Sequence, residues 1–312
     1  MASRQWAARL LRGLVVGALV PLAAQASDGV SDSQILIGQT LTLQGGKNEY
    51  GAAVRAGVET AIAQVNRSGG VGGRKLVFPV RAEHKQEFRA LMAQARSLGM
   101  KRVAFARSDS ETGQLHLANV QRLAKAVGIE AVTDLPFKSD INDAQLAAMV
   151  QKIASSGAQM VFNHGGAGMY EKLIRRSRQT GVKAAFFGVN SGSTQLAKHL
   201  GDQASGMIFS QVMPSPWERK TALTRAYQDA FTKEKPGEAF SYGSLEGYLT
   251  ARALVEAIRR AGPNPTRESF LGGLRNVELN VEGTKIAYRT GEHAGMSLVD
   301  LSIVTGEGRF RH

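Results

Sequence analysis

Residues 142–189 have the sequence NDAQLAAMVQKIASSGAQMVFNHGGAGMYEKLIRRSRQTGVKAAFFGV, in which helical patterns alternate with short apolar runs. The first helical pattern follows a cap at Asn142 or Asp143. Its apolar residues recur every three or four positions, as on the buried face of a helix: Leu146, Met149, Val150 and Ile153. The elements expected next are a strand over 159–163, a helix over 169–179 and a strand over 184–189. This alternation predicts a parallel sheet with helices on both faces.

The same alternation continues toward both ends of the chain. Further strands are expected over 34–42, 75–80, 102–106 and 129–133. Further helices are expected over 51–66, 88–98 and 115–127. After Pro214 the pattern changes to helices over 217–233, 244–261 and 266–274, followed by antiparallel strands in KIAYR and LVDLSIV. The fold class is therefore α/β, with parallel sheets flanked by helices.

The first residues are typical of an export signal. Three arginines, Arg4, Arg9 and Arg12, accompany a mostly apolar run over 10–24, and a small-residue cleavage site ends at Ala26. The run is too short to span a bilayer. We therefore expect residues 1–26 to be a signal peptide cleaved near Ala26 and the mature protein to be periplasmic. A buried core helix or a membrane anchor is the alternative interpretation.

Composition argues against several classes of function. The chain has no cysteine, which excludes disulfides, thiolate metal sites and cysteine catalysis. The formal net charge is +13, but the basic residues are dispersed and are not interleaved with aromatics, so nucleic acid is not an expected partner. The six histidines form no metal-binding motif, and neither a nucleophile elbow nor a P-loop is present. We expect no catalytic residue, no metal and no cofactor.

Ligands of open parallel sheets bind outside the carboxyl ends of the strands, so the strand-to-helix turns are the candidate site. The candidate ligand-binding residues are Gln44, Gly45, Ser108, Asp109, Thr112, His164, Gly165, Asn190 and Ser191. Several have a simpler interpretation: an ordinary turn at 44–46, helix capping in the 108–112 segment, and a bystander role for His164. Tyr242 and Glu246 are further candidates for the hinge side, although both also suit the start of a helix.

Several of these segments together resemble the leucine/isoleucine/valine-binding family of periplasmic proteins. The similar segments are 35–76, ending in the turn NRSGGVGGRKL, and 140–166, 175–214 and 240–274. The resemblance implies a type I periplasmic binding fold, in which two α/β lobes close on a small solute, usually an amino acid. It also implies that the membrane permease of an ABC transporter recognises the closed form.

The chain differs from the family in the first lobe. RKLVFPV, ending at Val80, runs almost directly into the segment that resembles the crossover to the second lobe, so we expect a truncated first lobe. The expected lobes are 27–98 with 215–262, and 99–214 with 263–312. In leucine-binding members of the family an acidic residue binds the ammonium of the ligand, and the matching position in this chain is at or near Asn190. A tyrosine that the family often has matches Thr112. An amide cannot replace a carboxylate in a charge-assisted bond, unless Asp109 or Glu111 substitutes.

Two functions of different classes follow from the sequence. The first is a non-enzymatic periplasmic protein that delivers an amino acid or similar small polar solute to an ABC transporter. The alternative is a degenerate family member that binds no solute and acts as a structural or protein-interaction module. An exported hydrolase is the weakest hypothesis, because no nucleophile–base arrangement is visible.

Overall fold

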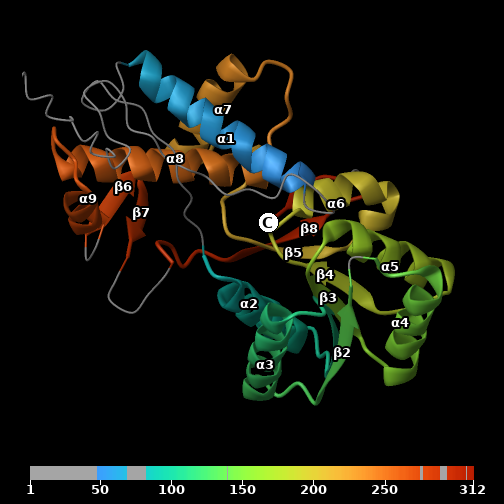
Figure 1. Ribbon diagram of the computed structural model, residues 1–312. Helices are drawn as coiled ribbons and strands as arrows, with labels where there is room; N and C mark the ends of the chain where they lie inside the picture. The colour runs from blue at the N-terminus through green and yellow to red at the C-terminus, as the bar shows by residue number, and fades with distance from the viewer. Residues whose placement is uncertain (1–47, 69–81, 139, 275–276, 289–293, 307) are drawn as a thin grey trace, which may run out of the picture.

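The computed structural model describes residues 48–68, 82–138, 140–274, 277–288, 294–306 and 308–312 (Figure 1). The expected signal peptide, the strands over 34–42 and 75–80, and the candidate residues Gln44 and Gly45 lie outside these ranges. Within the described residues, every helix is too short or too polar to cross a membrane.

A seven-stranded sheet with the order β2-β1-β3-β4-β5-β8-β9 forms the larger part of the fold. Its strands are β1 Arg102–Ser108, β2 Ala131–Phe137, β3 Met160–His164, β4 Ala185–Gly188, β5 Ile208–Gln211, β8 Asp300–Val304 and β9 Phe310–Arg311. The first five strands pair in parallel, whereas β8 is antiparallel to both β5 and β9. The predicted parallel sheet and the antiparallel end of the chain are therefore confirmed.

Helices cover both faces of this sheet, as predicted. They are α2 His84–Ser97, α3 Glu111–Ala126, α4 Asp143–Ser156, α5 Ala167–Gln179 and α6 Ser193–Leu200, with a short 3₁₀ turn over Gly201–Ala204. The first two pack on one face and the next three on the other. In α4 the predicted inner residues are buried, and Asn142 caps the helix by accepting from the Gln145 N–H at 2.9 Å. We call this sheet with α2–α6 the sheet unit.

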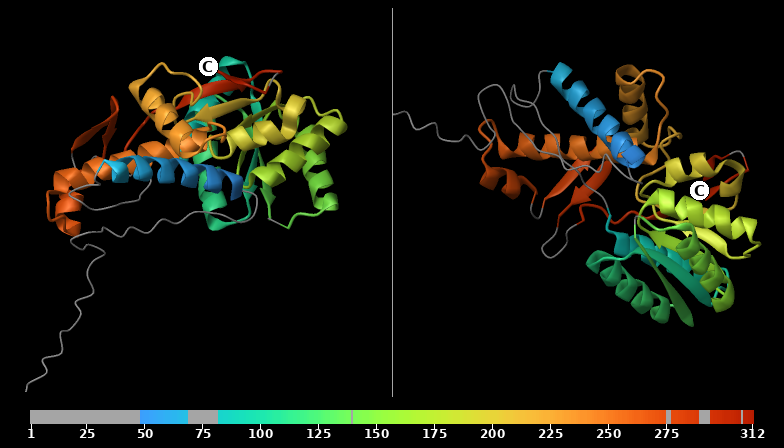
Figure 2. Two further views of the ribbon diagram at one scale, coloured as in Figure 1. Left: turned by 90° about the horizontal axis from the view of Figure 1, so that it is seen from above. Right: turned by 45° about the vertical axis from the view of Figure 1, so that its right-hand side comes forward.

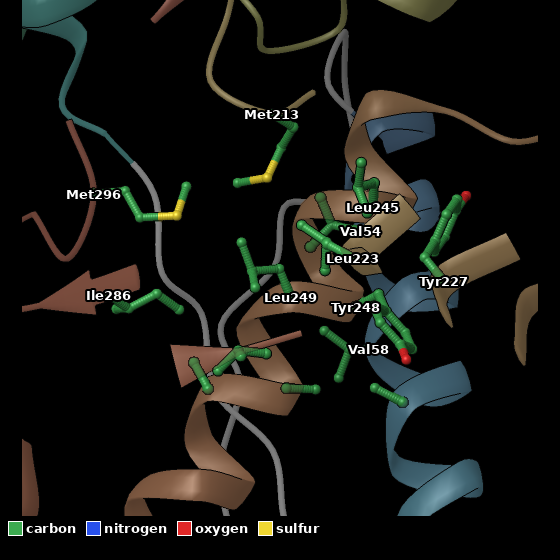
Figure 3. Packing of buried hydrophobic residues seen from close by; sticks show 14 of the residues in the cluster. Val54, Val58, Met213, Leu223, Tyr227, Leu245, Tyr248, Leu249, Ile286 and Met296 are labelled. Carbon is green, nitrogen blue, oxygen red and sulfur yellow. The ribbon is translucent and has the colours of Figure 1, made fainter. Parts of the chain in front are cut away.

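A second group of elements packs beside it, as both views in Figure 2 show. It contains α1 Asn48–Arg67, α7 Ala222–Glu234, α8 Tyr242–Ala261, α9 Arg267–Leu274, β6 Glu278–Val281 and β7 Thr284–Ala287. Its core residues come from the helices and the β6–β7 ribbon, including Val54, Leu223, Tyr248 and Ile286, and Met296 from the segment after β7 packs with them (Figure 3). We call this group the helical unit.

Glycines bring α1 and α8 into close contact at the centre of the helical unit. A Cβ atom on Gly57 would lie 1.7 Å from the carbonyl oxygen of Ser244, and one on Gly247 would lie 2.0 Å from that of Val54. Each distance is far inside van der Waals contact. The two backbones can therefore cross at this spacing only because neither residue has a side chain.

The packing differs from the expected lobe boundaries at two places. Helix α2 falls within the expected range 27–98, but Phe88 and Leu91 pack in the core of the sheet unit. The β6–β7 ribbon falls within the expected range 263–312, but Leu279 packs with the helical unit. Helix α7 also starts later than the predicted Trp217, because the proline-containing segment 214–216 ends before a capping box at Thr221 begins the helix. The division into lobes and the truncation of the first lobe stay predictions.

Candidate functional site

Three strand-to-helix loops lie side by side at the carboxyl edge of the sheet. They follow β1, β3 and β4, which are neighbours in the strand order. The loops after β3 and β4 touch, because a Cβ atom on Gly192 would lie 3.4 Å from the Cβ of Ala167. The sequence therefore placed seven of its candidates on one edge: Ser108, Asp109, Thr112, His164, Gly165, Asn190 and Ser191.

The loop after β1 is built around the start of α3. Ser110 is the N-cap and accepts from the Gly113 N–H at 3.1 Å, while the hydroxyls of Ser108 and Ser110 lie 3.0 Å apart. Asp109 is held through its backbone, which donates to the carbonyl of Phe137 at 2.7 Å. The side chains of Asp109 and Thr112 are exposed. Helix capping thus accounts for the serines of this loop.

The loop after β3 begins with a cluster of imidazoles. His164 ends β3, with its ring centroid 4.0 Å from that of His116 on α3 and 4.5 Å from that of His84 on α2. All three rings surround Phe88, at centroid distances of 5.3 to 6.2 Å. Gly165 follows where a Cβ atom would lie 2.4 Å from the ring of Phe137, so a side chain here would require that ring to move. His164 is therefore part of a packed ring cluster.

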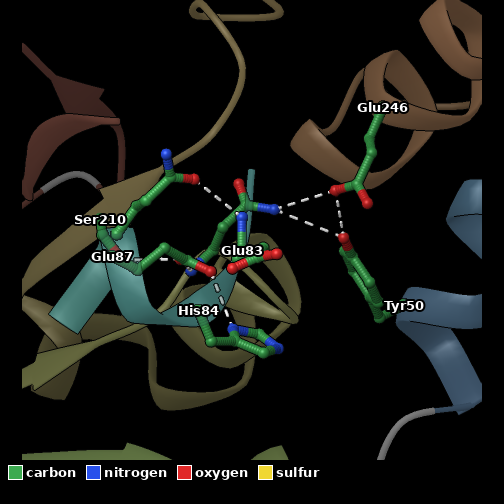
Figure 4. Close-up of polar contacts among 8 residues, drawn as sticks. Tyr50, Glu83, His84, Glu87, Ser210 and Glu246 are labelled. Atoms are coloured by element: carbon green, nitrogen blue, oxygen red, sulfur yellow. Dashed lines mark hydrogen bonds and ion pairs between the residues drawn. The ribbon is translucent and has the colours of Figure 1, made fainter. Parts of the chain in front are cut away.

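The loop after β4 connects the sheet unit to the helical unit through Asn190. Its side-chain amide donates to Glu246 Oε2 at 3.1 Å and to the Tyr50 hydroxyl at 3.3 Å. Tyr50 lies in the first turn of α1 and Glu246 in the second turn of α8, and the Tyr50 hydroxyl donates to the same carboxylate oxygen (Figure 4). Asn190 is completely buried, and Glu246 is 6% exposed. Three elements far apart in the sequence thus meet at one polar contact.

A buried carboxylate on α2 holds the loop after β4 in place. Glu87 on α2 is 0% exposed and accepts from the Asn190 backbone N–H and from the Ser210 hydroxyl, both at 2.8 Å. Its other oxygen lies 2.9 Å from His84 Nδ1. A carboxylate that accepts several hydrogen bonds can remain buried at tolerable cost. Glu87 therefore joins the histidine cluster to the loop that carries Asn190.

Sequence reasoning missed Glu87 and Tyr50. The only local signal was the spacing of His84 and Glu87, three positions apart on a helix, where side chains can meet. Of the two hinge-side candidates, Glu246 belongs to the contact, whereas Tyr242 has a different setting. The Tyr242 hydroxyl lies 2.8 Å from His312 Nε2, and burial raises the pKa of Tyr242 well above its ordinary value.

A second polar contact joins the units on the outer side of the loop. His199 near the end of α6 lies 3.0 Å from Glu49 of α1 through Nε2, and 3.3 Å from Glu171 of α5 through Nδ1. These side chains are 22 to 50% exposed, so solvent weakens the attraction. Over the ranges that the structure describes, no group of three or more acidic or histidine side chains has the arrangement of a metal site.

Comparison with known proteins gives this geometry a family context. A sequence model described as periplasmic binding protein matches residues 75–305. The leucine-, isoleucine-, valine-, threonine- and alanine-binding protein of Pseudomonas aeruginosa is 24% identical over 164 residues, which are 52% of this chain and 42% of that protein. The match thus spans less than half the length of this curated relative.

Solved structures match over most of the chain. An extracellular ligand-binding receptor from Verminephrobacter eiseniae has a TM-score of 0.77 at 22% identity, covering 86% of this chain and 97% of its own. A possible leucine/isoleucine/valine-binding protein from Rhodopirellula baltica has a TM-score of 0.78 at 18% identity, covering 87% and 94%. At these identities the similarity establishes the fold, which is the α/β periplasmic binding fold that the sequence predicted.

Proposed function

Because the chain belongs to the periplasmic binding protein family, we propose that it binds a small polar solute in the periplasm and delivers it to an ABC transporter. The first candidates are amino acids and related carboxylates, since the curated relative is named for binding amino acids. In this proposal residues 1–26 direct export and are cleaved near Ala26. The chain acts as a binding protein and not as an enzyme.

One observation carries the proposal: the loop after β4 makes hydrogen bonds to the helical unit through a single buried side chain. Asn190 bonds to Tyr50 and Glu246 across the boundary between the units. The other candidate loops lie at the same edge of the sheet. A solute that contacts this edge and the helical unit together binds better when the units are closed, so it shifts the population toward the closed form.

The proposed solute contacts come from the three loops at this edge. They are Ser108, Asp109 and Thr112 after β1, His164 and Gly165 after β3, and Asn190 and Ser191 after β4, with Gln44 and Gly45 from outside the described residues. Ser108 and Gly165 also have structural roles in their loops. We expect the larger share of the binding free energy to come from the loops after β3 and β4, because the side chains of His164 and Asn190 in these loops are buried.

The proposal is tested by ligand screening of the purified mature protein. A solute that binds the native state raises the melting temperature by mass action, so a metabolite panel rich in amino acids should contain stabilising members. For a solute found in this way, Asn190→Ala should weaken binding at least about tenfold, the equivalent of one strong hydrogen bond. The matched control Asn119→Ala, on α3 away from the edge, should change the Kd less than about twofold.

Closure can be measured separately, because the chain has no cysteine that would interfere with labelling. Spin labels on Lys152→Cys in α4 and Lys233→Cys in α7 report the distance between the units, and both positions are exposed. Added solute should narrow and shift the distance distribution. A flat thermal response across the whole panel, with distances that no solute changes, would favour the alternative of a non-binding structural module.

A further inference from the structure

Helices α5 and α6 carry an excess of basic side chains. Residues 167–206, which run from α5 through β4 and α6 to the turn before β5, contain six lysines and arginines and two acidic residues, so their net charge is +4. Two of the basic residues, Lys183 and Lys198, are exposed between α5 and β4 and near the end of α6. The other four fall within seven positions of α5: Lys172, Arg175, Arg176 and Arg178. We call these six residues the basic surface.

The packing of α5 places these charges at the surface. The helix buries its apolar residues against the sheet, which leaves Lys172, Arg176 and Arg178 exposed. The Arg175 guanidinium donates to the backbone carbonyl of His199 and so joins α5 to the end of α6. Both helices lie on the same face of the sheet (Figure 1). The cations of α5 and α6 therefore belong to one side of the sheet unit.

Few of these charges are neutralised by neighbouring side chains. Glu171 is the only acidic residue in the sequence of α5, and it pairs with Arg175. Over the residues that the structure describes, the other three cations of this helix form no ion pair with an acidic side chain. Helix α8 differs, because its Arg260 pairs with Glu256 on the same helix. The basic surface therefore presents a positive charge that an anionic partner can neutralise.

The character of the surface indicates which anionic partner it fits. Among the described residues, the large hydrophobic side chains that are exposed lie on or beside other elements, at Leu98, Leu115, Trp217, Leu298 and Ile303. Protein interfaces are usually centred on aromatic or aliphatic side chains that fill pockets. A phospholipid surface, in contrast, attracts basic residues by charge alone. We propose that the basic surface binds the anionic headgroups of a phospholipid membrane.

The number of charges is sufficient for reversible attachment. Clusters of about four to eight lysines and arginines bind anionic membranes, and each basic residue near the surface strengthens binding about fivefold at moderate salt. The attraction falls off over about 10 Å at 0.1 M salt, so only residues that lie close to the membrane contribute fully. None of the six basic residues is a candidate for solute binding. Membrane attachment and the proposed solute binding can therefore fail independently of each other.

Vesicle sedimentation of the purified mature protein tests the proposal. The anionic vesicles contain phosphatidylglycerol and phosphatidylcholine in equal parts, and vesicles of phosphatidylcholine alone are the uncharged reference. At pH 7 and about 0.1 M NaCl, wild type should bind only the anionic vesicles, and about 0.5 M NaCl should weaken this binding at least about tenfold. The α5 variant, which combines Lys172→Gln, Arg176→Gln and Arg178→Gln, should bind about a hundredfold more weakly than wild type.

The matched control removes three exposed cations from the helices on the opposite face of the sheet. It combines Arg89→Gln in α2 with Arg122→Gln and Lys125→Gln in α3, so both variants have the same net charge. Glutamine is a good helix former, and both variants should melt close to wild type. The control should bind anionic vesicles within about threefold of wild type.

Three outcomes would overturn the inference. The first is that wild type does not bind the anionic vesicles, and the second is that the α5 variant and the control lose binding equally, since net charge alone would then explain it. The third is that the α5 variant keeps its binding to vesicles but loses binding to immobilised poly-L-glutamate, which would assign the basic surface to an acidic protein partner.

Discussion

Replacing Glu87 is the sharpest test of how the Asn190 loop is held in place. This carboxylate is fully buried and accepts from the Asn190 N–H and the Ser210 hydroxyl, while His84 Nδ1 lies 2.9 Å from its second oxygen. In Glu87→Ala the two donors, which belong to fully buried residues, lose their acceptor. In Glu87→Gln the side-chain oxygen can still accept both hydrogen bonds, and only the charge facing His84 is lost.

The expected magnitudes follow from these contacts. Each buried donor left without a partner costs about 1–3 kcal/mol, so Glu87→Ala should lower the free energy of unfolding by about 4 kcal/mol. Glu87→Gln should cost about 1 kcal/mol, the range of a single weakened hydrogen bond. Because folded domains have a stability of about 5–15 kcal/mol, the alanine variant should lose a large share of it and the glutamine variant a small one.

Urea unfolding at pH 7, followed by far-ultraviolet circular dichroism, measures both values. The matched control is Glu130→Ala, which removes an exposed carboxylate paired with Lys101 and should cost less than about 0.5 kcal/mol. The reasoning fails if Glu87→Ala lies within about 1 kcal/mol of wild type, or if the glutamine and alanine variants are equally destabilised, since charge and not acceptor loss would then dominate.

Further predictions concern the helical unit and the processing of the chain. Gly247→Ala should destabilise the protein by at least about 2 kcal/mol by forcing α8 away from α1, while Gly272→Ala, with open space around it in α9, should be neutral or slightly stabilising in the same urea assay. Burial raises the pKa of Tyr248 to about 12 from 10.0. The folded state then holds this phenol proton more tightly than the unfolded state does. The resulting contribution to the free energy of unfolding is complete below pH 10 and is lost as pH rises toward 12. In Tyr248→Phe the free energy of unfolding should therefore fall less steeply with pH over this range. Mass spectrometry of the exported protein should find a mature start near Ser27, and an uncut chain would contradict the predicted cleavage.

The sequence predicted elements whose signals are local. The cap at Asn142 and the spacing of apolar residues behind it depend on a single turn of chain, and the structure confirms both. The order of strands and helices then fixed which loops share the carboxyl edge, so His164 and Asn190 could be placed there without coordinates. Capping of α3 by Ser110 was likewise foreseeable as the simpler interpretation of its loop.

The contacts that define the site could not be predicted in the same way. Glu87 bonds to residues 103 and 123 positions away, and Tyr50 to one 196 positions away. No periodicity marks such pairs, because their distance depends on how the two units pack and not on local conformation. The polar side chains of α1 and α8 also fit an ordinary helix start, so their sequence gave no sign that Tyr50 and Glu246 face Asn190.

The polar character of this contact explains how the two units could separate without unfolding. The apolar clusters lie mainly within one unit or the other, around Phe88 in the sheet unit and around Tyr248 in the helical unit. The boundary contacts of Asn190 and His199 are hydrogen bonds and ion pairs, which water replaces at a net cost of about 0.5–1.5 kcal/mol each. A solute that contacts the sheet edge and the helical unit together adds stability to the closed arrangement alone, which is the condition for binding to drive closure.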